Sequence, residues 1–428
     1  MQQENYSEVL SLAARAGRIL LENGAEISRV DDIMSRISSH YGVDSGQFFV
    51  LSNGIFTSGN SSSVEKVDKA GGQAQTYANV EFIPIKAFQF AKVIAVNKLS
   101  YDISRNKYTV REAWEELDRI QNLPGKPLWE RIAASSVGAC AFCAIFGGGF
   151  TDCLVSFAVG FIFALFSIFV SSRYFSKIVA TLAEGLVLSM LCIVAYRLGL
   201  VRSLSNVIIG SVMLLVPGLA FVNGVRDLAN ADYLSGLTRM TDALLTFLCI
   251  AIGVSFSFIV DSWFMGEVIS LPGVVVSMQT YGYPLQALAA FLSTMSFAAI
   301  FGVPRANYLM CGLTGTIGWL VYLLMLRTVG ASIPVATVMA TVTLSIVSRF
   351  GAVKSKCPAT VFMLCGLFPL VPGGGIFWCI YYCTTSQLQS ALSTGFVAAQ
   401  VVICIVLGIV LAMELPQRIF SGRKKLIH

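Results

Sequence analysis

The chain has 428 residues, of which 55% are apolar and only 13% are charged, and its net charge is +6. A soluble domain carries about 25% charged residues, so this composition excludes a wholly soluble fold. Charged residues are at ordinary density only in the first 130 positions. The chain therefore combines a water-exposed N-terminal part with a long membrane-embedded part.

Several function classes find no support in the sequence. Most of the eleven cysteines lie in apolar runs, where they act as small hydrophobic residues, and the Cys140/Cys143 pair has no His or Asp beside it. A P-loop and a nucleophile elbow are absent, and the two histidines are His40 and His428. Basic residues do not alternate with aromatic ones. We therefore expect no catalytic residue, no metal, no cofactor and no nucleic-acid partner.

The N-terminal part is predicted to be a cytoplasmic α+β domain over residues 1–128. Its first residues lack the basic and apolar regions of a secretory signal. Apolar residues at helical spacing over 6–39, interrupted at Asn23-Gly24-Ala25, predict two helices. Strands are expected over 47–51, 54–57 and 80–85, and helices over 86–117 with a capping box from Thr109 to Glu112.

Ten apolar stretches follow, each near the length of about 20 residues that crosses a hydrocarbon core. They predict a polytopic α-helical membrane protein, and they cover 132–148, 152–172, 177–196, 205–222, 241–261, 285–302, 306–326, 331–348, 358–383 and 391–414. The predicted domains are a first five-helix repeat over 129–262, an extracytoplasmic linker over 263–284, a second five-helix repeat over 285–416 and a basic cytoplasmic tail over 417–428.

Basic residues indicate the orientation, because cytoplasmic loops collect Lys and Arg. With the N-terminal domain inside, the predicted inner loops and the tail hold most of the basic residues, whereas the segment 261–284 holds none. A multi-pass protein of the bacterial cell membrane with both termini in the cytoplasm fits this distribution.

The two halves of the membrane part resemble each other. Phe142-Cys-Ala-Ile-Phe-Gly147 recurs as Phe297-Ala-Ala-Ile-Phe-Gly302, and 297 − 142 = 155. Leu215-Val-Pro-Gly218 recurs as Leu370-Val-Pro-Gly373, and 370 − 215 = 155 again. Since each repeat has five spans, an odd number, the second repeat must enter the membrane from the opposite side. The sequence predicts an inverted-topology repeat.

The Leu-Val-Pro-Gly segments predict where a substrate could bind. Proline inside a helix removes a backbone hydrogen bond, so both the fourth and the ninth span should be broken. A simple packing kink is the alternative, but paired breaks in two inverted halves favour a substrate site with helix ends suited to an anionic group. The candidate binding residues are Pro217, Gly218, Asn223, Arg226, Asp227, Pro372, Gly373 and Gly374.

Acidic residues in or beside spans are candidates for proton coupling, because burying a charge in a membrane is costly. Glu184 is embedded in an apolar span, Asp242 begins the fifth span and Asp152 follows a Gly-Gly-Gly segment. Under the shift of 155, Asp152 corresponds to Asn307, so the halves differ in charge there. For each acid, a structural ion pair is the alternative.

These residues resemble the threonine/serine exporter (ThrE) family. The resemblance rests on Leu20-Leu-Glu-Asn-Gly-Ala-Glu-Ile-Ser-Arg-Val30, on Leu215–Gly218 followed by Asn223-Gly-Val-Arg-Asp-Leu228 and Asp232-Tyr-Leu-Ser-Gly-Leu237, and on Leu370–Gly374. The chain resembles a fused form of the two-subunit YjjP/YjjB-like type. Two departures from the family are the segment 261–284 and Ile27, which stands where Ser or Thr is expected.

The resemblance implies a secondary exporter of threonine and serine, driven by the proton-motive force, that lies in the lipid bilayer and carries an amino acid as its small-molecule substrate. A dicarboxylate (succinate-type) exporter on the same fold is the first alternative. A membrane-tethered enzyme or sensor is the second, although ten spans exceed what an anchor requires. The sequence is also compatible with a homo-oligomer.

Overall fold

The computed structural model describes residues 6–44, 46–60, 76–83, 88–266, 269, 281–416 and 419–420. Most of the predicted linker 263–284 and of the basic tail 417–428 lies outside the described residues. The chain forms two compact units, each considered by itself below. Unit 1 comprises Met1–Gly125 with the short segments Asp232–Gly236 and Phe301–Pro304, and unit 2 comprises the remaining residues.

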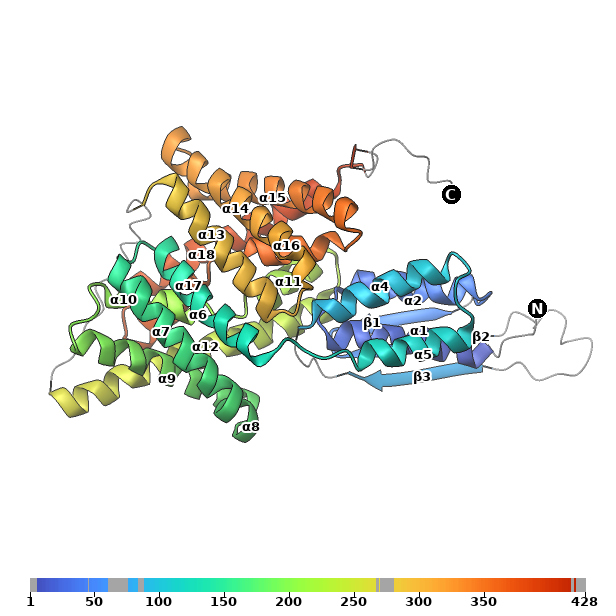
Figure 1. Cartoon of the computed structure of the whole chain (residues 1–428), viewed down its shortest axis with the longest axis horizontal. Helices are drawn as coiled ribbons and strands as arrows, with labels where there is room; N and C mark the ends of the chain where they lie inside the picture. Colours follow the sequence, from blue (N-terminus) through green and yellow to red (C-terminus); the bar gives the residue numbers. More distant parts are fainter. Residues whose placement is uncertain are drawn as a thin grey trace, which may run out of the picture. The chain divides into compact units, whose positions relative to one another are not determined.

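Unit 1 is built on a three-stranded antiparallel sheet in the order β1-β2-β3. Helices α1 and α2 pack against β2 and β1, respectively, and α4 and α5 both pack on α1 (Figure 1). The bounds are α1 Tyr6–Glu22, α2 Ile27–His40, β1 Gln47–Leu51, β2 Gly54–Asn60, β3 Thr76–Phe82, α4 Phe90–Ile103 and α5 Val110–Gln121.

Local signals in the sequence explain several of these boundaries. The chain turns between α1 and α2 at Gly24, whose φ of +84° suits glycine. At the start of α5, the Thr109 N–H donates to Glu112 Oε2 at 2.8 Å and the Glu112 N–H donates to Thr109 Oγ1 at 3.4 Å. The predicted capping box is therefore confirmed. The third strand lies earlier than predicted, over 76–82, and positions 84–85 are outside the described residues.

One face of the sheet is apolar and exposed. Phe49 of β1 lies opposite Phe56 of β2, which lies opposite Val80 of β3. These side chains are 55%, 43% and 66% exposed. The row gives unit 1 an apolar surface on the face that α1 and α2 leave open.

Two short connections from later in the chain belong to unit 1. The Phe90 and Ala91 N–H groups, at the start of α4, donate to the carbonyls of Phe301 and Gly302 at 2.9 and 3.1 Å. The first N–H groups of a helix have no partner within the helix, so these carbonyls serve as a cap. Likewise, the Ser52 N–H donates to Ser235 Oγ at 3.1 Å. The connections 232–236 and 301–304 are thus fixed by hydrogen bonds within unit 1.

Unit 2 is helical, and the described residues contain eight helices long and apolar enough to cross a membrane. The chain is therefore a polytopic helical membrane protein. These helices are α6 Leu128–Ile145, α7 with its continuation Phe150–Tyr174, α9 Lys177–Arg197, α12 Tyr233–Met265, α13 Tyr283–Ile300, α14 with its flanking turns Arg305–Val329, α15 Ile333–Ser355 and α18 Leu388–Met413. Two further predicted spans are each a pair of shorter helices: α10 Leu204–Val212 with α11 Gly218–Ala229, and α16 Ala359–Leu367 with α17 Gly373–Thr384.

The helices recur at the shift found in the sequence. Helices α13, α16 and α17 begin 155 residues after α6, α10 and α11, since 283 − 128, 359 − 204 and 373 − 218 all equal 155. Both α7 and α14 end in a π-helical turn, at Ser167–Ser171 and Met325–Val329. Gly160 and its equivalent Gly315 lie where helices pack closely. A Cβ added to Gly160 would lie 3.0 Å from Ala139 Cβ, and a Cβ added to Gly315 would lie 2.1 Å from Thr294 Oγ1. Ala139 and Thr294 are themselves 155 residues apart.

Unit 1 should show a pH-dependent stability that is set by Asp31. Burial raises the pKa of the Asp31 carboxyl, and the neighbouring carboxylates of Asp32 and Asp232 add to this effect. Because the charged form is disfavoured in the fold, stability should fall as the pH rises from the ordinary Asp value of about 3.9 to the raised pKa. Asp31→Asn should raise the thermal midpoint of the full chain at pH 7, with less gain at lower pH.

Asp102 provides a control of opposite sign. A hydrogen bond from Lys107 lowers the pKa of Asp102, so its charged form stabilises the fold. Asp102→Asn should therefore lower the thermal midpoint at pH 7. An equal response of the two variants would contradict the assignment.

Candidate functional site

Both predicted helix breaks are present in unit 2. Helix α10 ends at Val212 and α11 begins at Gly218, with Pro217 at φ −77° and ψ 48°. Helix α16 ends at Leu367 and α17 begins at Gly373, with Pro372 at φ −78° and ψ 44°. The two prolines adopt nearly the same backbone conformation because the same Leu-Val-Pro-Gly segment interrupts the helix in each half.

The two breaks face each other reciprocally. A Cβ added to Gly218 would lie 3.2 Å from Val371 Cγ1 and 3.5 Å from Phe368 Cε1. A Cβ added to Gly373 would lie 2.7 Å from Val216 Cγ1 and 3.1 Å from Met213 Sδ. Since 371 − 216 and 368 − 213 both equal 155, each glycine meets the equivalent residues of the other half. This is the contact pattern of a twofold axis.

Aromatic packing extends this pseudo-twofold arrangement. The rings of Phe142 and Phe297, which are equivalent residues, meet edge to face with centroids 5.5 Å apart. Phe297 also stacks on Phe368 with a centroid distance of 3.6 Å. The first helices of the two halves, α6 and α13, therefore pack together beside the breaks. Gly374, the last candidate of the second break, lies against Ile209 of α10.

The candidate polar residues of the first half share one buried face of α11. Asn223, Arg226 and Asp227 are spaced i, i+3 and i+4, and all are buried. Asp227 Oδ2 forms an ion pair at 3.3 Å with Arg239 of α12, and both side chains are under 10% exposed. The charged residues Arg226 and Asp227 therefore lie between two and three helical turns beyond the first break.

The equivalent face of α17 is aromatic. The positions 155 residues after Asn223, Arg226 and Asp227 are Trp378, Tyr381 and Tyr382, and all three are buried. Trp378 contacts both tyrosine rings, with centroids 5.2 and 5.5 Å away. Tyr381 reaches Phe258 of α12 in the first half at 6.2 Å. Equivalent helices of the two repeats therefore carry different side chains: α11 has buried charged groups, and α17 has buried aromatic rings.

The three candidate acids have separate partners. Glu184 on α9 is half-buried and accepts a hydrogen bond at 2.7 Å from Ser167 Oγ in the π-helical turn after α7. Asp242 forms an exposed ion pair with Lys177. Asp152 is buried, and its carboxylate accepts hydrogen bonds from the backbone N–H groups of Gly149 and Arg202 at 2.9 and 2.7 Å. Glu184 thus bonds to one uncharged side chain, whereas Asp242 pairs with a lysine and Asp152 bonds to several backbone N–H groups.

Several polar residues of unit 2 were not singled out from the sequence. Arg239 pairs with Asp227, and Glu130 accepts hydrogen bonds from Arg305 at 2.8 Å and from Tyr308. These partners are distant in sequence, so spacing gave no signal. Trp378 could have been found, because applying the shift of 155 to Asn223 leads directly to it.

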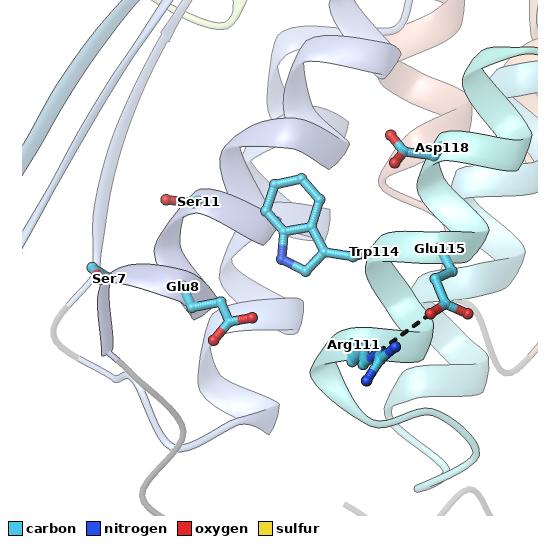
Figure 2. Close-up of a pocket in the computed structure, with 7 residues that line it drawn as sticks. All are labelled: Ser7, Glu8, Ser11, Arg111, Trp114, Glu115 and Asp118. Carbon is cyan, nitrogen blue, oxygen red and sulfur yellow. Dashed lines mark hydrogen bonds and ion pairs between the residues drawn. The ribbon is translucent and has the colours of Figure 1, made fainter.

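Unit 1 contains an open groove of about 440 Å³ between α1 and α5. Figure 2 shows Trp114 projecting from α5 into it, with the Arg111–Glu115 ion pair on one side and Glu8 of α1 on the other. Asp118, also at the groove, pairs with Arg15 at 3.0 Å. Much of the charge in the groove is therefore balanced within unit 1.

The duplicated helices, facing breaks and buried polar cluster define a membrane transporter rather than an enzyme. A family model described as "Putative threonine/serine exporter" matches residues 11–260. A second, "Threonine/Serine exporter, ThrE", matches residues 286–414. The chain belongs to the threonine/serine exporter family.

Curated relatives agree with this membership. The "Threonine/serine exporter" of Corynebacterium glutamicum is 22% identical over 96% of this chain and 83% of its own length. The "Probable threonine/serine exporter" of Mycobacterium tuberculosis is 23% identical over 79% of this chain and 65% of its own length. The "Probable succinate transporter subunit YjjP" of Escherichia coli is 26% identical over 59% of this chain and 95% of its own length. No solved structure matches the chain.

A disulfide should form between the two breaks. The Cβ position of Gly218 lies 3.7 Å from Val371 Cβ, close to the mean of about 3.8 Å in disulfides. The double variant Gly218→Cys/Val371→Cys should cross-link under mild oxidation, and the bridge should appear in a mass-spectrometric peptide map. Each single variant is the control. Absence of the bridged peptide in folded protein would contradict the facing arrangement.

The Asp227–Arg239 pair should behave as a coupled unit. Removing one partner of a buried ion pair leaves an uncompensated charge and costs about 3 kcal/mol. Asp227→Ala or Arg239→Ala alone should therefore lower unfolding stability strongly in detergent. The double variant should be more stable than the sum of the single effects indicates. Strict additivity would show that the two charges do not interact.

Proposed function

We propose that this protein is a secondary active exporter of small amino acids, threonine and serine, driven by the proton-motive force across the bacterial cell membrane. The observation that carries the proposal is the reciprocal contact of the two Pro-Gly breaks. Broken backbone at membrane depth persists only where protein or a wet cavity satisfies it. Paired breaks at the centre of a duplicated fold are typical of a transport site.

The membrane topology proposed here has ten spans in two inverted repeats. Each broken pair, α10 with α11 and α16 with α17, counts as one span. The N-terminal domain, both termini and the even-numbered connections lie in the cytoplasm. Two facts support this orientation: the connections 232–236 and 301–304, predicted to be cytoplasmic, belong to unit 1, and basic residues concentrate in the inner loops.

The substrate is proposed to bind between α11 and α17. Helix N-termini carry partial positive charge, so the amino ends of these helices at Gly218 and Gly373 favour a carboxylate. Arg226 and Arg239 add positive charge, and Asp227 suits the ammonium group of an amino acid. The aromatic face of α17 would exclude water from the bound substrate. Binding in this place would require Pro217, Gly218, Pro372, Gly373 and Gly374 to keep the breaks open.

Glu184 is the proposed proton carrier. It is half-buried in a largely apolar helix, and it accepts a hydrogen bond from the neutral hydroxyl of Ser167. Asp152 and Asp242 stay as weaker candidates, because Asp152 is held by backbone N–H groups and Asp242 is exposed and paired with Lys177. A π-helical turn at the Ser167 position also fits a functional role, since such turns concentrate at functional sites.

A dicarboxylate exporter is the second candidate. It is favoured by the likeness to the Escherichia coli succinate-transporter subunit and by two buried arginines, Arg226 and Arg239, which could bind two carboxylates. Counterflow in proteoliposomes separates the two candidates. Excess unlabelled serine should displace labelled threonine under the first, whereas only the second predicts displacement by succinate.

Replacing the proton carrier should uncouple transport from the pH gradient. Glu184→Gln should lower threonine efflux driven by a proton gradient about 10-fold or more, because a residue with no ionisable proton cannot exchange one. Efflux from proteoliposomes at graded external pH measures this. The matched control is Glu414→Gln, an exposed acid just beyond α18. Wild-type efflux in the Glu184 variant would remove this residue from the mechanism.

A further inference from the structure

The exposed apolar side chains of unit 1 are concentrated on one face of its sheet. Among the described residues up to Gly125, five large apolar side chains are exposed, and four of them lie on the face that α1 and α2 leave open. These four are Phe49, Phe56, Val80 and Phe82. Large exposed apolar patches usually mark a surface that binds a protein or a membrane. The open face of the sheet is therefore a candidate interaction surface.

The apolar character is confined to one end of this face. Side chains on the face form rows across the three strands, and successive rows are two residues, or about 7 Å, apart. The central row consists of Phe49, Phe56 and Val80. The row next to the turn between β1 and β2 consists of Leu51, Gly54 and Phe82, and the row on the other side consists of Gln47, Ser58 and Ala78. The face thus changes from aromatic to polar within one row.

The apolar end of the sheet is the end that is bonded to a membrane-spanning helix. In the turn between β1 and β2, the Ser52 N–H donates to Ser235 Oγ at 3.1 Å. Ser235 belongs to α12, which is long and apolar enough to cross a membrane. The Ile83 N–H, directly after β3, donates to the Asn53 carbonyl in the same turn at 2.8 Å. All three strands therefore present their apolar end at this attachment.

The connections to the spanning helices add to this evidence. Tyr233 and Leu234, which precede Ser235, are 63% and 64% exposed. Phe301 and Gly302, whose carbonyls cap α4, directly follow the spanning helix α13. Because one residue spans at most about 3.6 Å, Gly302 lies within about 7 Å of the end of that helix. Unit 1 is thus held near the membrane surface at two points.

The size of the patch suits a lipid surface better than a protein partner. A stable protein interface buries about 800 Å² and 20–30 residues on each side, and two rows of a three-stranded sheet supply far fewer. Segments that lie in the membrane interface bury an apolar face rich in Phe and Leu about 5–10 Å deep. Two rows about 7 Å apart match that depth.

We propose that the open face of the unit 1 sheet docks on the lipid surface. Phe49, Phe56 and Phe82 enter the boundary between the headgroups and the acyl chains, and the polar row beyond them stays in water. This contact gives unit 1 an attachment to the membrane besides its two connections to spanning helices. It does not depend on which substrate the protein carries.

Photocross-linking of the full-length protein in nanodiscs of phosphatidylcholine and phosphatidylglycerol tests the proposal. The photoreactive residue p-benzoylphenylalanine is placed singly at Phe82, Phe56, Ser58 or Tyr101, and adducts are identified by mass spectrometry. The probe at Phe82 or Phe56 should give about 10-fold more lipid adduct than the probe at Ser58 or Tyr101. Ser58 is the matched control on the same face, one row farther out, and Tyr101 is an exposed aromatic residue on α4.

A charge on the apolar end of the face should weaken the contact. With the probe at Val80, Phe82→Asp should lower the lipid adduct about 5-fold, because a carboxylate is disfavoured at the acyl boundary. Gln47→Asp adds the same charge in the polar row and should leave the adduct within about twofold. All these positions are exposed, so the substitutions remove no core side chain, and the thermal midpoint verifies folding.

The cross-linked partner decides between the possible occupants of the face. Lipid adducts at Phe82 and Phe56, with little at the two controls, support the proposal. Adducts to a second copy of the chain would show an interface between copies and overturn it. Adducts only to the same chain, or none at either position in folded protein, would overturn it as well. Threonine counterflow is measured separately, so a failure of the exporter function leaves the lipid contact standing.

Discussion

A proline inside a membrane helix leaves backbone groups that lipid cannot hydrogen-bond, and this constraint organises unit 2. The Leu-Val-Pro-Gly segment occurs twice, at 215–218 and 370–373, and the two copies pack against each other. Val371 and Phe368 cover Gly218, and Val216 and Met213 cover Gly373. The interrupted backbone of each half is thereby placed at the pseudo-twofold axis, against the equivalent segment of the other half. A side chain has little room at Gly373, where an added Cβ would lie 2.7 Å from Val216 Cγ1, and more room at Gly218, where the nearest atom is 3.2 Å away.

The symmetric backbone carries asymmetric chemistry. Asn223, Arg226 and Asp227 correspond to Trp378, Tyr381 and Tyr382, so the helix after the first break is polar where the helix after the second is aromatic. The two repeats have therefore diverged to buried charged groups on α11 and buried aromatic rings on α17.

The sequence was most informative where signals were local or repeated. The two breaks and the capping box at Thr109 could be predicted because each depends on neighbouring residues, and the shift of 155 could be predicted because two separate segments repeat at the same offset. Partners formed by folding could not be predicted: Glu130 and Arg305 are 175 residues apart, and Ser167 reaches Glu184 from a π-helical turn that no spacing rule indicates. The third strand was misplaced by several residues, because the apolar pattern that marked it continues past the end of β3 at Phe82 into Ile83-Pro84-Ile85.

The contact at the axis has the character of quaternary structure within a single polypeptide. Each Pro-Gly segment packs against residues of the other repeat, so the contact at the axis needs both repeats. Packing at Gly218 and Gly373 therefore joins the two halves directly. A protein assembled in this way can be encoded as one gene or as two without altering its central architecture.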